Sequence, residues 1–115
     1  MTDQRTIFKK IIDGDIPAER VYEDELCLAF HDITPQAPVH VLLIPKKEIR
    51  NMDGVGNEDQ ALIGHMLCKV KEIAAKLNLG QGYRLVANCG QDGGQSVDHL
   101  HFHILGGRQL KWPPG

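Results

Sequence analysis

The stretch HLHFHIL, residues 99–105, places three of the chain's six histidines at every second position. Successive side chains of a β-strand point to opposite faces of a sheet, so this spacing predicts a strand with His99, His101 and His103 on one face. The residues between them are apolar and would face the hydrophobic core: Leu100, Phe102 and Ile104. Three explanations are open for the histidine face: a solvent-exposed polar face, a metal site or a catalytic site.

A glycine-rich loop, DGGQS at residues 92–96, comes just before this strand. Because glycine lacks a Cβ atom, the backbone amides of Gly93 and Gly94 could form an anion-binding nest, although a tight turn is the simpler explanation. Gln95 and Ser96 add neutral hydrogen-bond donors. A phosphate held here would lie near the histidines, whereas the H-x-H spacing also suits two ligands of a zinc ion. The chain has no Walker-type GxxxxGK[ST] motif, so the loop is not a P-loop.

The rest of the chain predicts short strands and one long helix. TIFKKIIDGDIP, residues 6–17, has the apolar spacing of a short amphipathic helix. Two strands around an acidic turn are expected within residues 20–38, and further strands within residues 39–47 and 82–90. The apolar repeat from Leu62 to Leu77 predicts the long helix, with Gly80 as its C-terminal cap. The elements together predict an α+β fold with about five strands in a mostly antiparallel sheet.

Composition narrows the class of protein. A chain of 115 residues predicts a single domain, residues 1–115, and its net charge of −2 gives no general attraction to nucleic acid or to membranes. Neither a signal peptide nor a membrane-spanning run is evident, so a soluble, cytoplasmic protein is expected. Cys27, Cys68 and Cys89 are odd in number and widely spaced, which argues against disulfides and a zinc ribbon and favours reduced, mostly buried thiols.

His40, in the stretch PVHVLLIP, is a fourth candidate histidine. It is either an ordinary hydrogen-bonded strand residue or, if its strand and the histidine strand face a common site, a residue that orients another imidazole. His31 and His65 are weaker candidates, because nothing near them in the sequence suggests a site and His65 falls within the predicted long helix.

At this point the sequence resembles a known family. HLHFHILGG fits the His-x-His-x-His-x-x pattern of the histidine triad (HIT) superfamily of nucleotide-binding proteins. FHDITPQAPVHVLLIPKK and GYRLVANCGQDGGQSVDHLHFHILGGRQLKWPPG are similar to the Hint branch, the purine nucleoside phosphoramidases, and the resemblance covers nearly the whole chain. It implies a HIT-like fold whose sheet continues across a two-fold homodimer, with no metal and no cofactor.

The resemblance also implies roles for the histidines. His101 would be the nucleophile that attacks the α-phosphorus of an adenosine or guanosine 5′-phosphoramidate, including AMP-lysine. His99 would orient it through a main-chain carbonyl, His103 would contact a phosphate oxygen, and His40 would support them. Ser96 would relay a proton to the leaving amine. A neutral imidazole is a good nucleophile at cellular pH, and a nucleotidyl-histidine intermediate splits a difficult displacement into two easier ones.

Further residues match substrate-binding positions of the family. Asn88, Gly94 and Gln95 match positions around the phosphate and leaving group. Asp32 would accept hydrogen bonds from the ribose hydroxyls, although it could simply begin a turn. The base would lie in an apolar slot, although these side chains could equally be ordinary core: Ile7, Phe8, Ile11, Phe30, Ile33 and Leu42. Trp112, in the tail, would reach toward the partner subunit's site.

The sequence departs from its relatives at two places. The N-terminal region reads TIFKK, without the cysteine pair with which some bacterial relatives bind zinc, and Asp98 adds a negative charge beside the triad. Three alternatives to the phosphoramidase stay open: a nucleotide-binding regulatory module with incidental turnover, a dinucleoside polyphosphate hydrolase, and a metal-dependent hydrolase.

Overall fold

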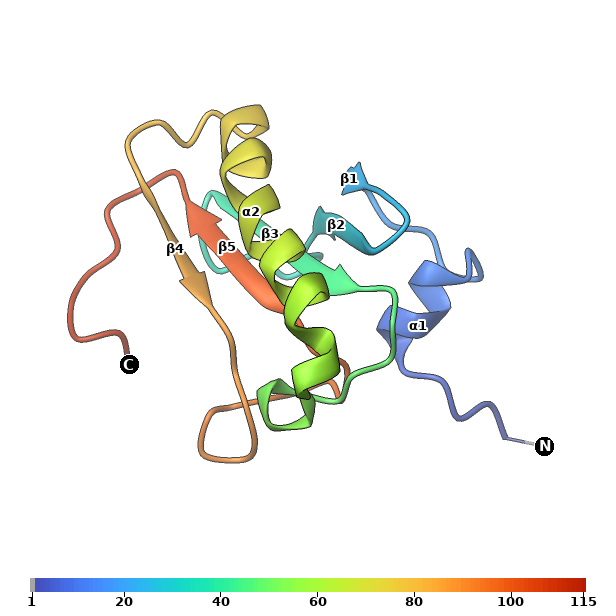
Figure 1. Ribbon diagram of the computed structural model, residues 1–115. Coiled ribbons are helices and arrows are strands. Elements are labelled where there is room, and N and C mark those ends of the chain that lie inside the picture. The colour runs from blue at the N-terminus through green and yellow to red at the C-terminus, as the bar shows by residue number, and fades with distance from the viewer. Residues whose placement is uncertain (1) are drawn as a thin grey trace.

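The central element is a five-stranded, fully antiparallel sheet in the order β1-β2-β3-β5-β4 (Figure 1), seen in a computed structural model that describes residues 2–115. Its strands are β1 (Arg20–Glu23), β2 (Cys27–His31), β3 (Val39–Pro45), β4 (Tyr83–Val86) and β5 (Phe102–Gly106). The helices are α1 (Ile7–Ile12) and α2 (Gln60–Lys76), with 3₁₀ turns at Met52–Gly54 and Asn57–Asp59. The predicted fold class is confirmed, including the one long helix and the short N-terminal helix.

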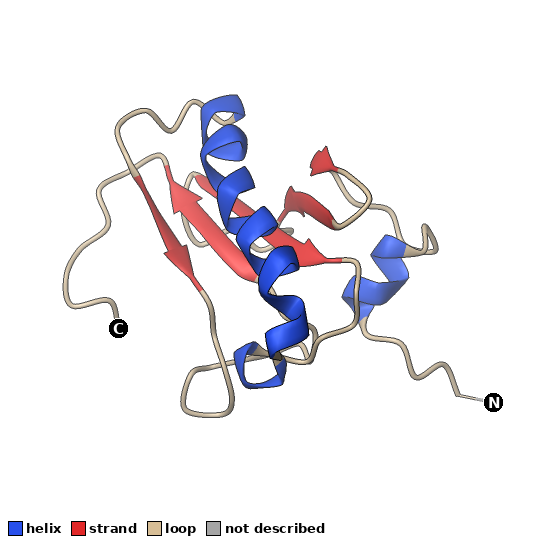
Figure 2. Ribbon diagram, in the orientation of Figure 1, coloured by secondary structure: helices blue, strands red, loops and turns tan. Residues whose placement is uncertain are grey.

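The two faces of the sheet have different covers (Figure 2). The long helix α2 packs on one face, where its buried residues join apolar side chains of β2, β3 and β5 in one cluster. Leu100, Phe102 and Ile104 belong to this cluster, so the predicted alternation along residues 99–105 holds. The short helix α1 packs on the opposite face, where Phe8 and Ile11 meet side chains of β2 and β3. The β5 and β4 half of that face lies beyond α1.

The ladder pairing of β5 starts later than the sequence predicts, at Phe102 rather than at His99. The reason is competition for backbone groups by the histidine side chains. His99 Nε2 donates to the carbonyl of Pro45 at 2.8 Å, and His101 Nδ1 donates to the carbonyl of His99 at 2.6 Å. The amide of Leu100 bonds to Ile49 instead of to a strand. Residues 99–101 therefore lie outside the ladder, and their hydrogen bonds come mainly from side chains.

The end of α2 also differs from the prediction. Asn78, and not Gly80, takes the left-handed conformation after the helix, with φ of 58°. Asn78 N bonds to the carbonyl of Ala75 and Leu79 N bonds to that of Ala74, which is the Schellman arrangement. Leu79 is buried in the α2 cluster and completes the motif with its hydrophobic contact. Asparagine adopts the left-handed conformation at little cost. The burial of Leu79 can therefore determine where the helix ends.

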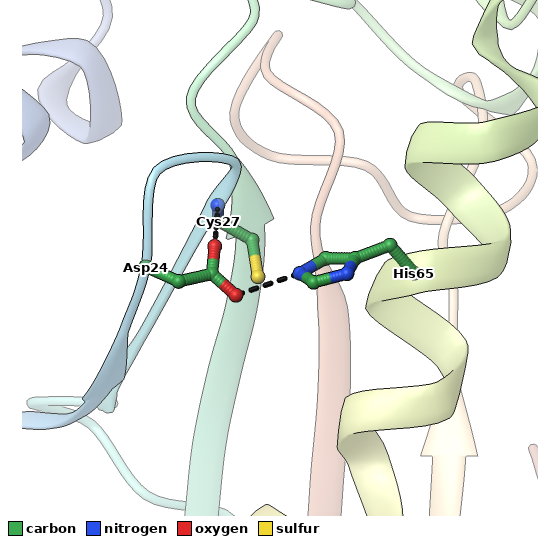
Figure 3. A group of neighbouring side chains, drawn as sticks. All are labelled: Asp24, Cys27 and His65. Atoms are coloured by element: carbon green, nitrogen blue, oxygen red, sulfur yellow. Dashed lines mark hydrogen bonds and ion pairs between the residues drawn. The ribbon is translucent and has the colours of Figure 1, made fainter.

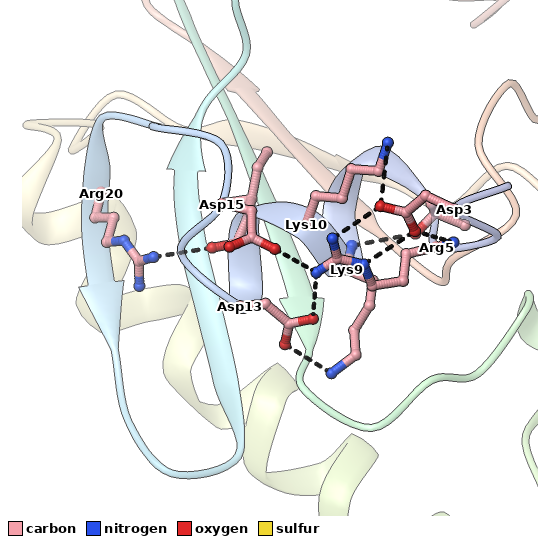
Figure 4. A network of polar contacts seen from close by, with 9 residues as sticks. Asp3, Arg5, Lys9, Lys10, Asp13, Asp15 and Arg20 are labelled. Atoms are coloured by element: carbon pink, nitrogen blue, oxygen red, sulfur yellow. Dashed lines mark hydrogen bonds and ion pairs between the residues drawn. The ribbon is translucent and has the colours of Figure 1, made fainter. Parts of the chain in front are cut away.

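Helix α1 is too short to be stable alone, and an ionic network holds its ends (Figure 4). The Arg5 guanidinium contacts Asp3 at 2.8 Å, Asp13 at 2.9 Å and Asp15 at 2.6 Å. Each such surface pair contributes little to stability, because solvent and salt screen it. Burial of Phe8 beneath the helix supplies the rest of the attachment.

Two expectations from composition concern membranes and thiols. Among residues 2–115, no helix combines the length and the apolar character that crossing a bilayer requires. All three cysteines are free thiols. Cys27 is buried and Cys89 half-buried, but Cys68 is exposed on α2, so the expectation of mostly buried thiols is wrong for Cys68.

Candidate functional site

Adjacent strands β3 and β5 bring His40 and His103 together on the face opposite α2. His40 Nε2 lies 2.8 Å from His103 Nδ1. The backbone amide of Gln36 donates to His40 Nδ1 at 3.0 Å, so that nitrogen carries no proton and Nε2 does. His40 Nε2 therefore donates to His103 Nδ1. The neutral His103 must then carry its own proton on Nε2, where it can be donated to a ligand.

His101 has the opposite tautomer. Its Nδ1 lies 2.6 Å from the carbonyl oxygen of His99, and because a carbonyl only accepts, Nδ1 carries the proton. The Nε2 atom of a neutral His101 is thus an unprotonated nitrogen with a free lone pair. The ring is fixed between two others: the edge of Phe8 at a centroid distance of 5.0 Å and His103 at 5.1 Å. A nitrogen held in this way can act as a nucleophile.

Burial keeps the supporting histidines neutral. Desolvation lowers the pKa of His103 to about 4, with a smaller contribution from His101 and His40 nearby. Desolvation also lowers the pKa values of His99 and His40, against smaller opposing effects of the Pro45 carbonyl on His99 and of Asp32 on His40. Near pH 7 these three rings are therefore neutral and keep the tautomers that their hydrogen bonds specify.

A cavity of about 380 Å³ opens next to the histidines, between α1 and the sheet. The structure brings many of the predicted site residues to its walls: Ile7, Phe8, Ile11, Phe30, Asp32, Ile33, His40, Leu42, Ser96 and His103. Phe8, Ile11, Phe30 and Leu42 are also buried in the α1 cluster, so they are core and cavity wall at once. Ile33 is 93% exposed and stands at the rim. His101 is buried and is not part of the wall.

Sequence reasoning missed other residues of the wall. Ile16, Pro17 and Ala18 come from the segment that follows α1, and Val97 comes from the segment after the glycine-rich loop. Their local sequence carries no periodic signal, so only the folded arrangement reveals them. His31 also lines the cavity, although it was a weak candidate from its local sequence.

Asp32 and Ser96 offer polar groups to the cavity. Asp32 Oδ1 accepts the amide of Thr34 at 2.8 Å, and its Oδ2 lies 3.5 Å from His40 Nε2. Asp32 therefore both begins a turn and presents a carboxylate to the cavity. Within residues 2–115, the backbone amides of Ser96 and Val97 donate to no other group. Both residues line the cavity, so two backbone amides without a partner in the described part of the chain lie beside it.

The glycine-rich loop differs from the predicted nest. Gly94 has φ of 76° and donates its amide to the carbonyl of Gln91, so this amide closes the loop instead of facing the cavity. A Cβ atom at Gly93 would collide with the carbonyl oxygen of Cys89, so the close approach of the two backbone segments requires that glycine. The glycines of this loop thus serve a tight turn, and Gly94 is not part of the cavity wall.

Gln95 is a structural link and offers no free side-chain donor. Its Nε2 donates to the carbonyls of Arg50 at 2.8 Å and Val97 at 3.0 Å, which occupies both amide protons. Its Oε1 accepts from the amide of Gly90 at 3.0 Å and from Asn51 Nδ2 at 3.4 Å. The expectation that Gln95 adds a donor to the site is therefore wrong. Gln95 instead ties the glycine-rich loop to the segment after β3.

Two predicted site residues lie outside the main cavity. Asn88 donates to the carbonyl of Gly93 at 2.6 Å and lines a neighbouring hollow of about 350 Å³, which shares His40 and His103 with the main cavity. Trp112 is 80% exposed, and its ring lies 6.0 Å from the guanidinium carbon of Arg84. Within one chain, Trp112 does not reach the site.

Three side chains at the site carry atoms of the kinds that bind metal ions. Ligand atoms of Asp32, His40 and His103 lie within 4.8 Å of one another. Both ring nitrogens of His40 are already in hydrogen bonds, to Gln36 and to His103. A metal ion would have to break the pairing that defines the His103 tautomer, so these residues fit a proton-ordered site better than a metal site.

Comparisons with a family model, with related sequences and with solved structures all point to the same protein family. Residues 13–110 match the model of the HIT domain. An uncharacterised HIT-like protein of Synechocystis is 61% identical over 110 residues, which cover 96% of each chain. Among solved structures, a HIT family hydrolase from Legionella pneumophila superposes with a TM-score of 0.93 at 49% identity, covering 96% of this chain and 100% of that one. A histidine triad protein from Clostridium difficile gives 0.90 at 41% identity, covering 96% and 97%.

Proposed function

This chain belongs to the HIT domain family, and from that premise we propose that it hydrolyses purine nucleoside 5′-phosphoramidates through a nucleotidyl-histidine intermediate on His101. Proteins of this family bind nucleotides, and the family points to a hydrolase. The substrate class is our inference from the site and from the resemblance of the whole chain to the Hint branch. AMP, GMP and their amides, including AMP-lysine, are the proposed ligands.

The observation that carries the proposal is the tautomer of His101. With Nδ1–H bonded to the His99 carbonyl, Nε2 holds the lone pair that attacks the α-phosphorus. In the first step an Nε2–P bond forms, the P–N bond breaks, and the amine leaves with the electron pair and a proton. In the second step water attacks the phosphorus, its proton passes to solvent, and the Nε2–P bond breaks with its electron pair returning to His101. Each step is easier than a direct displacement by water.

Charge on the phosphoryl oxygens is met by neutral donors. His103 Nε2–H and the amides of Ser96 and Val97 are available to them, and such positioned donors are the main source of rate enhancement in phosphoryl transfer. The Ser96 hydroxyl, at the same edge of the cavity, would pass a proton to the leaving amine. These chain residues supply positioning and hydrogen bonding without a further group.

The nucleoside would occupy the cavity between α1 and the sheet. A volume of about 380 Å³ with a largely apolar wall is within the size range of small-molecule sites. Phe8 and Phe30, whose rings meet edge to face at a centroid distance of 5.7 Å, would pack against the base. Asp32 Oδ2 would accept hydrogen bonds from the ribose hydroxyls, which favours ribose over deoxyribose.

We also propose that the protein acts as a homodimer in which the sheet continues through β4. This strand is the edge of the sheet, and within residues 2–115 it pairs with β5 alone. Tyr83 and Leu85 of β4 are among the exposed large apolar side chains. Unprotected edge strands tend to pair with another chain. In such a dimer the tail with Trp112 could reach the partner's site.

The test compares substrates under EDTA. An adenosine 5′-phosphoramidate with a fluorogenic amine should be turned over with kcat/KM well above that for diadenosine tetraphosphate. Faster cleavage of the dinucleotide would favour the polyphosphate hydrolase instead. Binding of AMP without turnover of either compound would favour a nucleotide-binding module and contradict the proposal.

A further inference from the structure

A second polar cluster lies on the α2 side of the sheet, away from the cavity. Asp24 belongs to the turn between β1 and β2, Cys27 begins β2, and His65 lies on α2 (Figure 3). One carboxylate oxygen, the thiol sulfur and one ring nitrogen lie within 4.8 Å of one another. The phosphoramidase chemistry proposed above uses none of these three residues. The cluster therefore calls for a separate explanation.

The carboxylate of Asp24 is held in a fixed orientation. Its Oδ1 accepts the backbone amides of Leu26 at 2.8 Å and Cys27 at 2.9 Å. Its Oδ2 faces His65 Nε2 at 2.6 Å and accepts the Tyr22 hydroxyl at 2.6 Å. Hydrogen bonds that orient a ligating side chain in this way are a regular feature of metal sites. The chain thus holds one oxygen pointed at a nitrogen and a sulfur from two other elements.

We propose that Asp24, Cys27 and His65 bind one thiophilic divalent cation, with Zn²⁺ as the best match, and that a water completes its coordination. Thiolate, imidazole and carboxylate are the ligands that zinc takes, whereas Mg²⁺ and Ca²⁺ prefer oxygen alone. Cys27 is fully buried, but the side chains of Asp24 and His65 are 24% and 30% exposed. The exposed side gives the ion and the water an entry path.

Binding exchanges contacts that the cluster already makes. His65 Nε2 would give up its bond to Asp24 together with its proton, the neutral ring would carry its proton on Nδ1 instead, and the Nε2 lone pair would then bind the ion. The Cys27 thiol would lose its proton when the ion binds, because the thiolate is the form that ligates a metal. The proton passes to solvent as the metal–sulfur bond forms.

Charge balance favours the occupied site. One thiolate and one carboxylate cancel the charge of a divalent ion, so the complex is neutral. A neutral complex is important because a positive charge lies nearby and would repel a net positive site. Lys69 Nζ is 5.9 Å from the centre of the Tyr22 ring, and the Tyr22 hydroxyl bonds to Asp24. The ion would join the β1–β2 turn to α2. We therefore expect it to contribute to stability rather than to catalysis.

The first experiment uses Co²⁺ as a spectroscopic probe of thiolate binding. The background is the Cys68→Ser, Cys89→Ser variant, in which Cys27 is the remaining thiol. After treatment with a chelator, Co²⁺ should produce a thiolate-to-cobalt charge-transfer band that saturates at about one equivalent and is displaced by Zn²⁺. Adding His65→Gln, which leaves Cys27 and the triad in place, should weaken binding at least tenfold.

The second experiment measures thermal unfolding of the same two proteins with and without Zn²⁺. The background protein should gain stability with Zn²⁺, and the His65→Gln variant should gain little, because a ligand stabilises only the state that binds it. Binding without a charge-transfer band, or an equal gain in both proteins, would show that the ion binds away from Cys27 and His65 and would overturn the proposal. Absence of any binding would overturn it too. Both experiments can be interpreted whether or not the protein is a phosphoramidase.

Discussion

His40 Nε2 donates a hydrogen bond to His103 Nδ1 across 2.8 Å, and through this contact a backbone amide at Gln36 determines which nitrogen of His103 carries its proton. The two histidines come from neighbouring strands β3 and β5, in which His103 pairs with Leu42 and His40 with Leu105. The register of the sheet therefore fixes the proton order of the site. The predictions below follow from this order and from the contacts around it.

Replacing His40 with alanine should lower kcat about ten- to a hundredfold while changing KM little. The variant removes the donor that keeps the His103 proton on Nε2, and loss of one direct donor costs about 10²–10³ in kcat. Steady-state kinetics with the phosphoramidate would measure the split. His65→Gln, a half-buried histidine with its own carboxylate partner, is the matched control and should keep wild-type kcat. A loss of affinity alone would argue against a positioning role for His40.

Asp32→Asn should weaken discrimination between ribose and deoxyribose. A carboxylate accepts from both ribose hydroxyls, and a hydrogen bond to a charged group contributes about 1.5–3 kcal/mol, so KM for the ribonucleotide should rise about tenfold or more. KM for the 2′-deoxy compound should change less. Equal increases for both substrates would show that Asp32 acts on His40, whose Nε2 is 3.5 Å away, and not on the sugar.

Gln95→Ala should lower the free energy of unfolding by about 1–3 kcal/mol, because it leaves the carbonyls of Arg50 and Val97 and the amide of Gly90 without their partner. Urea denaturation would measure the change. Gln91→Ala is the control, since this exposed side chain in the same loop forms no such link among residues 2–115. Equal effects of the two substitutions would refute the structural role of Gln95.

Stability should fall as pH decreases from about 6.5 toward 4, and His103→Asn should make this fall shallower. The pKa of His103 is about 4 in the native state and about 6.5 in the unfolded state. Between these pH values the unfolded state binds more protons, so lowering the pH favours the unfolded state. The share of His103 is at most about 3 kcal/mol. His99 and His40, with lowered pKa values, act in the same direction. Unfolding free energies of both proteins, measured at about pH 7.5, 6 and 5, would check this. Equal pH slopes for the two proteins would show that His103 is already charged in the native state.

Local patterns of the sequence were sufficient for the architecture. The alternation along residues 99–105 places the histidines opposite Leu100, Phe102 and Ile104, and the three- and four-residue repeat identifies α2. Both signals depend only on neighbours along the chain. The late start of β5 could not be predicted in this way, because it depends on His99 reaching the carbonyl of Pro45 from a distant part of the sequence.

For the candidate site too, local sequence patterns predicted some features, whereas features that depend on long-range contacts could not be predicted. Residue types indicated a histidine face with an apolar cavity beside it, and the fold brings Phe8, Asp32 and His103 to that cavity. The role of Gln95 depends on contacts with Arg50 and Gly90 that no local pattern contains. The loop residue Val97 also became visible as cavity wall only in the folded chain.

The most direct test of the central claim is turnover of the fluorogenic adenosine 5′-phosphoramidate by wild type and by His101→Ala, both in EDTA, with AMP binding measured in parallel. The account predicts steady turnover by wild type and its loss in the variant, with AMP affinity nearly unchanged, because the walls of the cavity are formed by other residues. Turnover by His101→Ala at the wild-type rate would contradict the account, since no nucleotidyl-histidine could then form at that position.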